Sequence, residues 1–155
     1  QSLHIVKYGE SLKEIVEKAP RRLTCILCKR LMYRVAERVS DRVEAEGLVT
    51  GEAIGEQASQ TLRNLRVLDD AAETYPVHRP LLGFDKAEIE MLARRIGTYE
   101  ASAKDVGGCE AVPYKPATKA KLKEVMEAED NLDLKTMVDR SVGSLTIVDL
   151  QKRSR

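Results

Sequence analysis

The sequence predicts an α/β fold, a three-layer sandwich in which helices cover both faces of a mainly parallel sheet. Short apolar runs alternate along the chain with longer segments whose apolar residues recur every three or four positions, as buried strands and amphipathic helices do. One apolar run, Leu48 and Val49, breaks at once into Thr50 and Gly51, which is typical of a buried parallel strand that ends in a loop. At 155 residues the chain is long enough for a single domain with its own core.

The first half of the chain contains a strand, two helices and a second strand. Residues 3–8 form the first strand, and Ser11 followed by Glu14 is a capping-box pattern for a short helix. A longer helix is predicted from Cys25 to Glu44, because apolar residues recur there at every fourth position. Gly47 is expected to end that helix before the strand at Leu48.

The same patterns predict the elements of the second half. In chain order they are a helical turn over 67–72, a strand over 76–82, a helix over 85–96, irregular chain over 98–116, helices over 118–129 and 132–142, a strand over 145–150, and a disordered basic tail over 151–155. Asp85 with Glu88 forms a second capping box. Lys86 is unusual there, because a cation in the first turn opposes the helix dipole.

Composition narrows the possible functions and locations. The chain has 26 basic and 25 acidic residues, so nucleic-acid binding would depend on local patches. No apolar run approaches the roughly 20 residues of a membrane span, and no signal peptide is recognised. Three cysteines, an odd number, do not suggest a disulfide framework, which favours a reducing, cytoplasmic location. A first residue of Gln1 predicts an excerpt from a longer polypeptide.

The segment 48–65 is the first candidate binding site. Ligands of open α/β sheets lie just beyond the carboxyl ends of the strands, which places Thr50 to Gly55 at such a position. Gly51 and Gly55 permit close approach of the backbone to a ligand. An uncharged polar stretch that includes Gln57 and Gln60 follows. The alternative is a polar loop in which Ser59 or Thr61 caps a helix.

A basic stripe is predicted on the long helix. Arg30, Arg34, Arg38 and Arg42 recur every four residues and therefore lie on one face. Such a stripe is either a solvated helix face or a surface that binds phosphate groups. The candidate nucleic-acid contacts on this stripe are Arg30, Arg34 and Arg38.

The cysteines form the third candidate site. Cys25 and Cys28 make a C-x-x-C at a helix start, where free backbone amides and nearby cations favour thiolates. Cys109, in a glycine-rich segment, is the remaining thiol. Three thiolates suit an iron–sulfur cluster with one open iron, whereas a structural zinc site normally takes four ligands. Two other hypotheses stay open: Cys109 carries a persulfide and the pair resolves the product disulfide, or all three thiols are unligated.

Ordered motifs in the chain resemble one protein family. They are L-V-T-G-E-A at 48–53, A-S-Q-T-L-x-N-L at 58–65, R-P-L at 79–81, D-K-x-E-I at 85–89, I-G-T at 96–98 and P-x-x-K-A at 116–120. This set resembles the catalytic domain of ThiI, the tRNA sulfurtransferase that makes 4-thiouridine, over about residues 3–120. The C-x-x-C resembles that of the archaeal-type branch.

The resemblance implies a fold of the PP-loop ATP pyrophosphatase (adenine nucleotide alpha hydrolase-like) class, and it implies roles for specific residues. Cys109 would be the sulfur-carrying catalytic residue, and Lys86, with Asp85 beside it, would help to activate the substrate. ATP with Mg²⁺ would bind along Val49, Thr50, Gly51, Glu52 and Ala53, with Gln57 and Gln60 nearby. Cys25, Cys28 and Cys109 would hold the iron–sulfur cluster. The implied partners are tRNA, a sulfide or persulfide donor, and a second copy or a complementing subunit.

The chain also departs from the family pattern. The family builds its ATP site on an S-G-G-x-D-S loop, which the sequence lacks, and V-G-G-C at 106–109 is not a substitute. By homology that loop belongs upstream of Leu3, so residues 1–150 are expected to be a PP-loop-type sulfurtransferase domain without its first strand and loop. The family's RNA-binding and rhodanese domains are not recognised, which weakens the inference of a role in thiamin synthesis. The alternatives are a non-catalytic cluster- or tRNA-binding subunit that complements a partner carrying the nucleotide loop, and a structural zinc domain.

Overall fold

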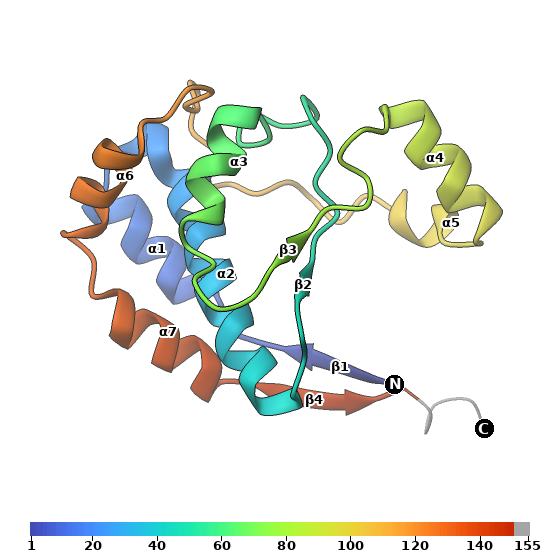
Figure 1. Cartoon of the computed structure of the whole chain (residues 1–155), viewed down its shortest axis with the longest axis horizontal. Coiled ribbons are helices and arrows are strands. Elements are labelled where there is room, and N and C mark those ends of the chain that lie inside the picture. Colours follow the sequence, from blue (N-terminus) through green and yellow to red (C-terminus); the bar gives the residue numbers. More distant parts are fainter. Residues whose placement is uncertain (151–155) are drawn as a thin grey trace.

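The computed structural model describes residues 1–150, and the predicted basic tail at 151–155 lies outside the described residues. Most of the chain is helical. In chain order the elements are β1 (Ser2–Ile5), α1 (Gly9–Lys18), the 3-10 turn η1 (Arg21–Leu23), α2 (Thr24–Val43), β2 (Leu48–Val49), α3 (Leu62–Asp69), β3 (Val77–His78), α4 (Lys86–Arg95), α5 (Tyr99–Ser102), α6 (Leu122–Glu129), α7 (Leu134–Gly143) and β4 (Thr146–Asp149) (Figure 1).

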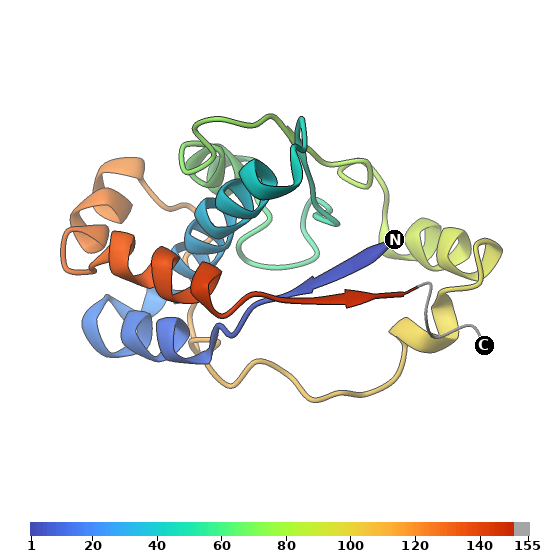
Figure 2. The ribbon, with the colours of Figure 1, turned by 90° about the horizontal axis from the view of Figure 1, so that it is seen from below.

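The strands form two separate two-stranded sheets within residues 1–150. β2 pairs with β3 in parallel, with Leu48 opposite Val77, whereas β1 pairs with β4 antiparallel. Figure 2 shows β1 and β4 side by side, away from the helical layer. The expected mainly parallel sheet between two helical layers is therefore not formed by these residues. Among the described strands, β2 and β3 are the parallel pair. No described strand pairs with the other edges of β1 and β2.

The core is built around α2. Helices α1, α3, α6 and α7 all contact this 20-residue helix, which lies between them in Figure 1. The buried face of α2 carries the apolar positions that the sequence pattern identified, including Leu27, Leu31 and Val35. Packing against α2 therefore organises the described residues more than sheet formation does. Helices α4 and α5 pack on each other at the far end from α6, and the chain then returns along one side of the molecule to α6 (Figures 1 and 2).

One predicted capping box and one predicted stop residue were wrong, and a second capping box is confirmed. Ser11 does not cap α1: the helix begins at Gly9, and the Ser11 hydroxyl is buried 3.3 Å from that of Ser141. α2 ends at Val43, within one residue of the predicted end, but its C-cap is Glu44, whose φ of 54° is left-handed, and not Gly47. Gly47 is needed for a different reason, because a Cβ there would lie 3.3 Å from Cδ2 of His78. At α4, the Asp85 capping box forms as predicted.

A buried ion cluster joins α2 to α3 and α6. Arg30 is only 1% exposed, and its Nε and Nη2 donate to the two carboxylate oxygens of Glu129 at 2.8 and 2.9 Å. Arg30 also donates to the carbonyl of Val67 and, at 3.0 Å, to Asp70. Arg34 donates to the same Glu129 carboxylate at 2.7 and 3.0 Å. Burial alone would raise the pKa of Glu129, but these hydrogen bonds from Arg30 and Arg34 lower it.

This cluster corrects the interpretation of the basic stripe. Arg30 is enclosed by acceptors and is not available to a phosphate group, and Arg34 is engaged with Glu129. Arg42 reaches the carbonyl of Val142 at 3.4 Å. Of the predicted nucleic-acid contacts, only Arg38 has a side chain that is about half exposed, and it lies 3.6 Å from Asp139. Sequence periodicity identified one helix face correctly but did not reveal that acidic residues from α6 and α7 cover it.

Glu129→Gln should destabilise the fold strongly. Removing one partner of a buried ion pair leaves the other charge uncompensated, which costs about 3–5 kcal/mol. Glu127→Gln on the same helix is the matched control, because Glu127 is exposed and 3.9 Å from Lys123, and its loss should cost less than about 1 kcal/mol. Urea unfolding at neutral pH measures both variants. Equal stability of the two variants would contradict a structural role for the cluster.

Candidate functional site

The three cysteines line one cavity. Cys25 and Cys28 lie in the first turns of α2, three residues apart and therefore on one helix face. Cys109 reaches the same place from the segment between α5 and α6. The cavity has a volume of about 160 Å³, and its other lining residues are Leu12, Thr24, Lys29, Met32, Gln57, Ser59, Ala111 and Val112. The fold thus brings together the two cysteine motifs that are distant in sequence, together with Gln57 from the segment after β2.

Buried hydrogen bonds fix the chain just before α6, which follows the segment that carries Cys109. Asn64, fully buried in α3, donates from Nδ2 to the carbonyls of Ala58 and Ala117, both at 2.8 Å. Its Oδ1 accepts from the amide of Ala120 at 3.0 Å. Thr61 accepts from the amide of Asn64, so it caps α3 as one of the sequence alternatives proposed. The amide side chain of Asn64 therefore ties the segment before α6 to the segment after β2.

Burial sets the acidity of the C-x-x-C thiols. Burial raises the pKa of Cys25, and the nearby Cys109 raises it further. Lys29 and Arg21 lower this pKa by less, so the net shift is upward. Burial also raises the pKa of Cys28, against smaller opposing effects of Tyr8 and Lys29. The expectation that the helix start favours thiolates was therefore wrong for these side chains at rest, because desolvation outweighs the cations.

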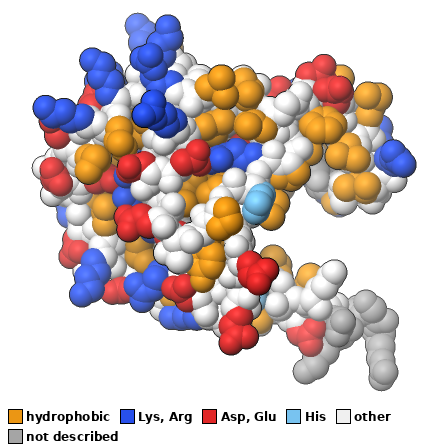
Figure 3. Space-filling model, viewed as in Figure 1, with side chains coloured by type: hydrophobic (Ala, Val, Ile, Leu, Met, Phe, Trp, Pro, Cys, Tyr) orange, Lys and Arg blue, Asp and Glu red, His pale blue; other side chains and the backbone are white. Residues whose placement is uncertain are grey.

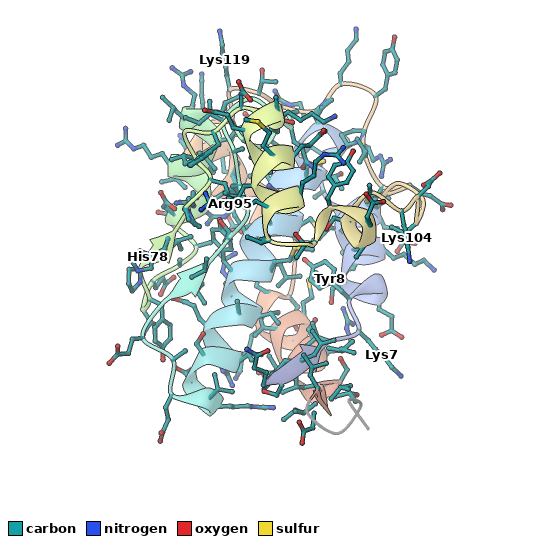
Figure 4. The ribbon with its side chains drawn as sticks, turned by 90° about the vertical axis from the view of Figure 1, so that its right-hand side faces the viewer. Lys7, Tyr8, His78, Arg95, Lys104 and Lys119 are labelled. Atoms are coloured by element: carbon teal, nitrogen blue, oxygen red, sulfur yellow. The ribbon has the colours of Figure 1, made fainter. Side chains whose placement is uncertain are left out.

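Tyr8 closes one side of the C-x-x-C turn. Its hydroxyl donates to the carbonyl of Cys28 at 2.7 Å, and Figure 4 shows Tyr8 beside α2. Burial raises the pKa of Tyr8 well above its ordinary range, so this hydroxyl stays protonated and keeps donating. The sequence contained no signal for this contact, because the two residues are 20 positions apart.

A buried carboxylate follows β2. Glu52 is 5% exposed and accepts from Lys29 Nζ at 3.0 Å, from the Tyr33 hydroxyl at 2.6 Å and from Arg79 Nε at 2.8 Å. The Thr50 hydroxyl donates to it at 3.2 Å. Burial alone would raise the pKa of Glu52, but the hydrogen bonds from Tyr33, Arg79 and Lys29 together outweigh it and lower the pKa. Within the described residues, Glu52 is thus a junction between the β2–β3 edge and α2.

Lys29 connects this junction to the cysteine cavity. It lines the cavity and donates to Glu52, which lies outside the lining. Arg79, from the R-P-L motif, also donates to Asp69 at 2.5 Å and to the Tyr33 hydroxyl at 3.0 Å. Sequence reasoning missed Tyr33 and Arg79. Tyr33 lies one helical turn after Lys29, but only their shared tertiary contact with Glu52 shows that the two side chains belong to one hydrogen-bond network.

The predicted ATP-binding residues divide into exposed and buried groups. Val49 is 72% exposed, and Gly51 is also exposed at the end of β2, whereas Glu52 and Ala53 are buried. Gln60 is buried, and within residues 1–150 its Oε1 has no hydrogen-bond partner. The hydroxyl of Thr24, which lines the cysteine cavity, is buried and unpartnered in the same way. Of these two atoms, only the Thr24 hydroxyl belongs to a residue that lines the cysteine cavity.

Asp85 and Lys86 belong to a different part of the molecule. Asp85 Oδ1 accepts from the amide of Glu88 at 2.9 Å, and Glu88 Oε2 accepts from the amide of Asp85 at 2.8 Å, so both side chains serve the cap of α4. Lys86 is exposed. Neither Asp85 nor Lys86 lines the cysteine cavity, and α4 lies in the peripheral helix pair of Figure 1. The structure does not bring these two predicted catalytic residues to the cysteines.

The three thiols of the cavity have the donor chemistry that an iron–sulfur cluster takes. Among residues 1–150, no three His, Cys, Asp or Glu side chains are placed to hold one metal ion. A structural zinc ion takes four ligands, with sulfur atoms about 2.3 Å from the metal. No described helix is long and apolar enough to cross a membrane.

Comparison with known proteins identifies close relatives. A family model described as thiamine biosynthesis protein (ThiI) matches residues 1–134. A probable tRNA sulfurtransferase of Methanosarcina mazei is 38% identical over 149 residues, which cover 94% of this chain and 36% of the relative. That of Caldanaerobacter subterraneus is 42% identical over 139 residues, which cover 88% of this chain and 36% of the relative. The chain therefore spans little more than a third of these relatives.

A solved structure shares the fold. It is described as the crystal structure of a 4-thiouridine synthetase–RNA complex with bound ATP, and it superposes with a TM-score of 0.87 at 36% identity. The match covers 95% of this chain and 39% of that one. The fold of this chain is thus shared with part of a longer chain.

The raised thiol pKa values predict slow alkylation of the C-x-x-C pair. At pH 7 iodoacetamide should modify the exposed Cys109 first, because Cys25 and Cys28 are partly buried and hold little thiolate. Their rates should still be rising as the pH passes 9.0, the ordinary thiol value, because a raised pKa shifts thiolate formation to higher pH. Mass spectrometry of the labelled peptides measures the rates. In urea the three should react alike, and fast labelling of Cys25 in the folded protein at pH 7 would contradict the prediction.

Proposed function

The chain belongs to the ThiI family, and we propose that it forms part of the catalytic domain of a tRNA 4-thiouridine synthetase. The observation that carries this proposal is the convergence of Cys25, Cys28 and Cys109 on one cavity, because sulfur transfer needs thiols that act together. The relative that shares the fold was solved with RNA and ATP, which supports tRNA as substrate and ATP as its activator. We place this reaction in the cytoplasm, with tRNA, a sulfide or persulfide donor, and a second copy or a complementing subunit as partners.

We propose that residues 1–150 complete a larger, mainly parallel sheet of the PP-loop class. Its other strands and the S-G-G-x-D-S loop would come from polypeptide outside this chain. Strand side chains support this: Leu3 and Ile5 of β1 are 48% and 47% exposed, and Val49 of β2 is 72% exposed. A cavity of about 450 Å³ between β1 and α2, lined largely by apolar residues such as Val6 and Met32, is also left open.

In the proposed reaction, ATP first activates the uridine. The uridine O4 attacks the α-phosphorus, pyrophosphate leaves, and AMP becomes the leaving group on C4. The exposed chain at Val49 to Gly51 would lie along the adenine and ribose, and Mg²⁺ would accompany the phosphates. Lys86 would stabilise charge that develops on the α-phosphate. Since Lys86 lies on the peripheral α4, this role requires the nucleotide to lie between β2 and α4, outside the cysteine cavity.

Sulfur then replaces AMP at C4. In the cluster form of the mechanism, Cys25, Cys28 and Cys109 would hold an iron–sulfur cluster whose open iron supplies a binding position for sulfide. The chain's own part is to keep the cavity shielded. Lys29, held by Glu52, would provide positive charge at the cavity wall. The raised thiol pKa values mean that ligand binding would release protons from Cys25 and Cys28.

The persulfide form needs no metal. The terminal sulfur of a Cys109 persulfide attacks C4 and AMP leaves, which joins the nucleoside to Cys109 through a disulfide. A thiolate of Cys25 or Cys28 then attacks the sulfur of Cys109, forms a protein disulfide and releases 4-thiouridine. A thiol reductant must reduce the protein disulfide before another cycle.

The activity test uses the intact native protein with tRNA and ATP under anaerobic conditions. Sulfide is the donor in one series, for the cluster form, and a persulfide donor with a thiol reductant is used in a second series, for the persulfide form. 4-Thiouridine, which absorbs near-ultraviolet light, should form only when ATP is present. Cys109→Ser should reduce its formation to background, because both forms of the mechanism use this sulfur. Ser102→Ala, an exposed change in α5, is the matched control and should leave the rate unchanged. Thiolation that persists at full rate in Cys109→Ser would contradict the proposal.

Iron analysis separates the two forms. After anaerobic purification, the cluster form predicts bound iron and sulfide in the unaltered protein and loss of both in Cys25→Ser, Cys28→Ser and Cys109→Ser alike. The persulfide form predicts a metal-free active protein in which labile sulfur is found on Cys109 alone. Stoichiometric zinc would contradict both and restore the structural zinc hypothesis.

A further inference from the structure

A basic surface lies where α3 meets the start of α6. We call it the α3–α6 surface and define it by Arg63 and Arg66 of α3 and by Lys119 and Lys121 of the segment before α6. All four side chains are exposed. Figure 3 shows Lys and Arg side chains gathered over these elements at the upper left, and Figure 4 shows Lys119 pointing outward at the top of the molecule.

These four cations are not neutralised within the described part of the chain. None of them forms an ion pair there, whereas Arg30, Arg34 and Arg79 are each bound by carboxylates. Other surface cations, such as Lys13 and Lys18 of α1, pair with a glutamate one turn away. In a chain whose total charge is only +1, this group is a local concentration of positive charge. Such a patch attracts a polyanion although the whole molecule does not.

The surface is also concave. Arg63, Arg66 and Lys121 line a depression of about 410 Å³ whose floor includes Val67, Ala120 and Leu122. Asp70 lies at its edge, but a carboxylate oxygen of Asp70 accepts from the buried Arg30 at 3.0 Å. Cations around an apolar floor fit a sugar–phosphate backbone, because the phosphates meet the rim and the sugars cover the floor.

The cations stand on a rigid support. Leu65 and Leu68 anchor α3 in the core at 4% and 0% exposure. The Thr61 hydroxyl donates to the carbonyl of Thr118 at 2.7 Å, and Asn64 binds the backbone on either side of it. The spacing between α3 and residues 117–121 is therefore fixed. The segment 57–61 leads from the cysteine cavity, which Gln57 and Ser59 line, directly into α3, so the surface and the cavity adjoin along the chain.

We propose that the α3–α6 surface binds backbone phosphates of the tRNA substrate and orients that RNA toward the cysteine cavity. The proposal rests on the proposed function for the identity of the polyanion. Within residues 1–150 it replaces the α2 stripe as the candidate basic surface, because carboxylates pair with Arg30, Arg34 and Arg38 of the stripe. Phosphate contacts fix the position of an RNA without reading its sequence. This suits a surface made of long side chains with no buried polar group for base recognition.

The test measures tRNA binding by the intact native protein over a series of salt concentrations. Arg63→Gln with Arg66→Gln removes two phosphate contacts, so the slope of log K against log salt should become shallower by roughly 1.4 to 1.8. Lys119→Gln with Lys121→Gln is an independent second variant and should shift the slope in the same direction. Lys13→Gln with Lys18→Gln removes the same charge from α1 and should leave the slope unchanged. Unaltered thermal unfolding shows that each variant is folded.

The outcomes separate this proposal from the proposed function. A shallower slope in both surface variants, and not in the α1 variant, supports the surface. It does so even if the unaltered protein binds tRNA without thiolating it, a result that would overturn the proposed reaction alone. An unchanged slope in a protein that does thiolate tRNA overturns the surface alone. An unchanged slope together with slower sulfur delivery from a protein persulfide donor would also overturn it, and would assign this face to that donor.

Discussion

The rest of the structure depends on the ion pair between Arg30 and Glu129. Arg30 lies in the middle of α2, and its guanidinium reaches α6 through Glu129 and α3 through Asp70 and the Val67 carbonyl. Taking these charges out of water is unfavourable unless every donor finds an acceptor, so the three helices are held in one arrangement. That arrangement sets where the chain between α3 and α6 runs. The spacing of the α3–α6 surface follows from it.

A second buried carboxylate does the same for the β2–β3 edge. Glu52 accepts from two α2 residues, Lys29 and Tyr33, and from Arg79 just after β3. Two short strands have little backbone pairing of their own, and these side-chain bonds hold them against the helix. Because Lys29 also lines the cysteine cavity, this network joins the cavity to the end of β2.

The cysteine cavity illustrates a competition that sequence patterns do not resolve. A helix start and nearby cations favour thiolates, whereas burial favours neutral thiols. At Cys25 and Cys28 burial is the larger effect. A pair of neutral thiols is protected from unwanted oxidation and becomes a ligand or a nucleophile only when a metal or a persulfide arrives.

The sequence by itself determined the family, the long helix α2 and the local cap at Asp85, because motifs, helix periodicity and capping depend on residues that are close along the chain. Only the tertiary structure decided which polar side chains are occupied. Charged residue types that often bind ligands occur at Arg30, Arg34 and Glu52. In the folded chain they form hydrogen bonds with partners 19 to 99 positions away. The arrangement of the strands in two separate sheets could likewise not be predicted from these residues. Strand pairing depends on which strand edges are covered by other parts of the fold. The convergence of Cys109 on the C-x-x-C turn belongs to the same class, because Cys28 and Cys109 are far apart in sequence and only the folded chain brings them to one cavity.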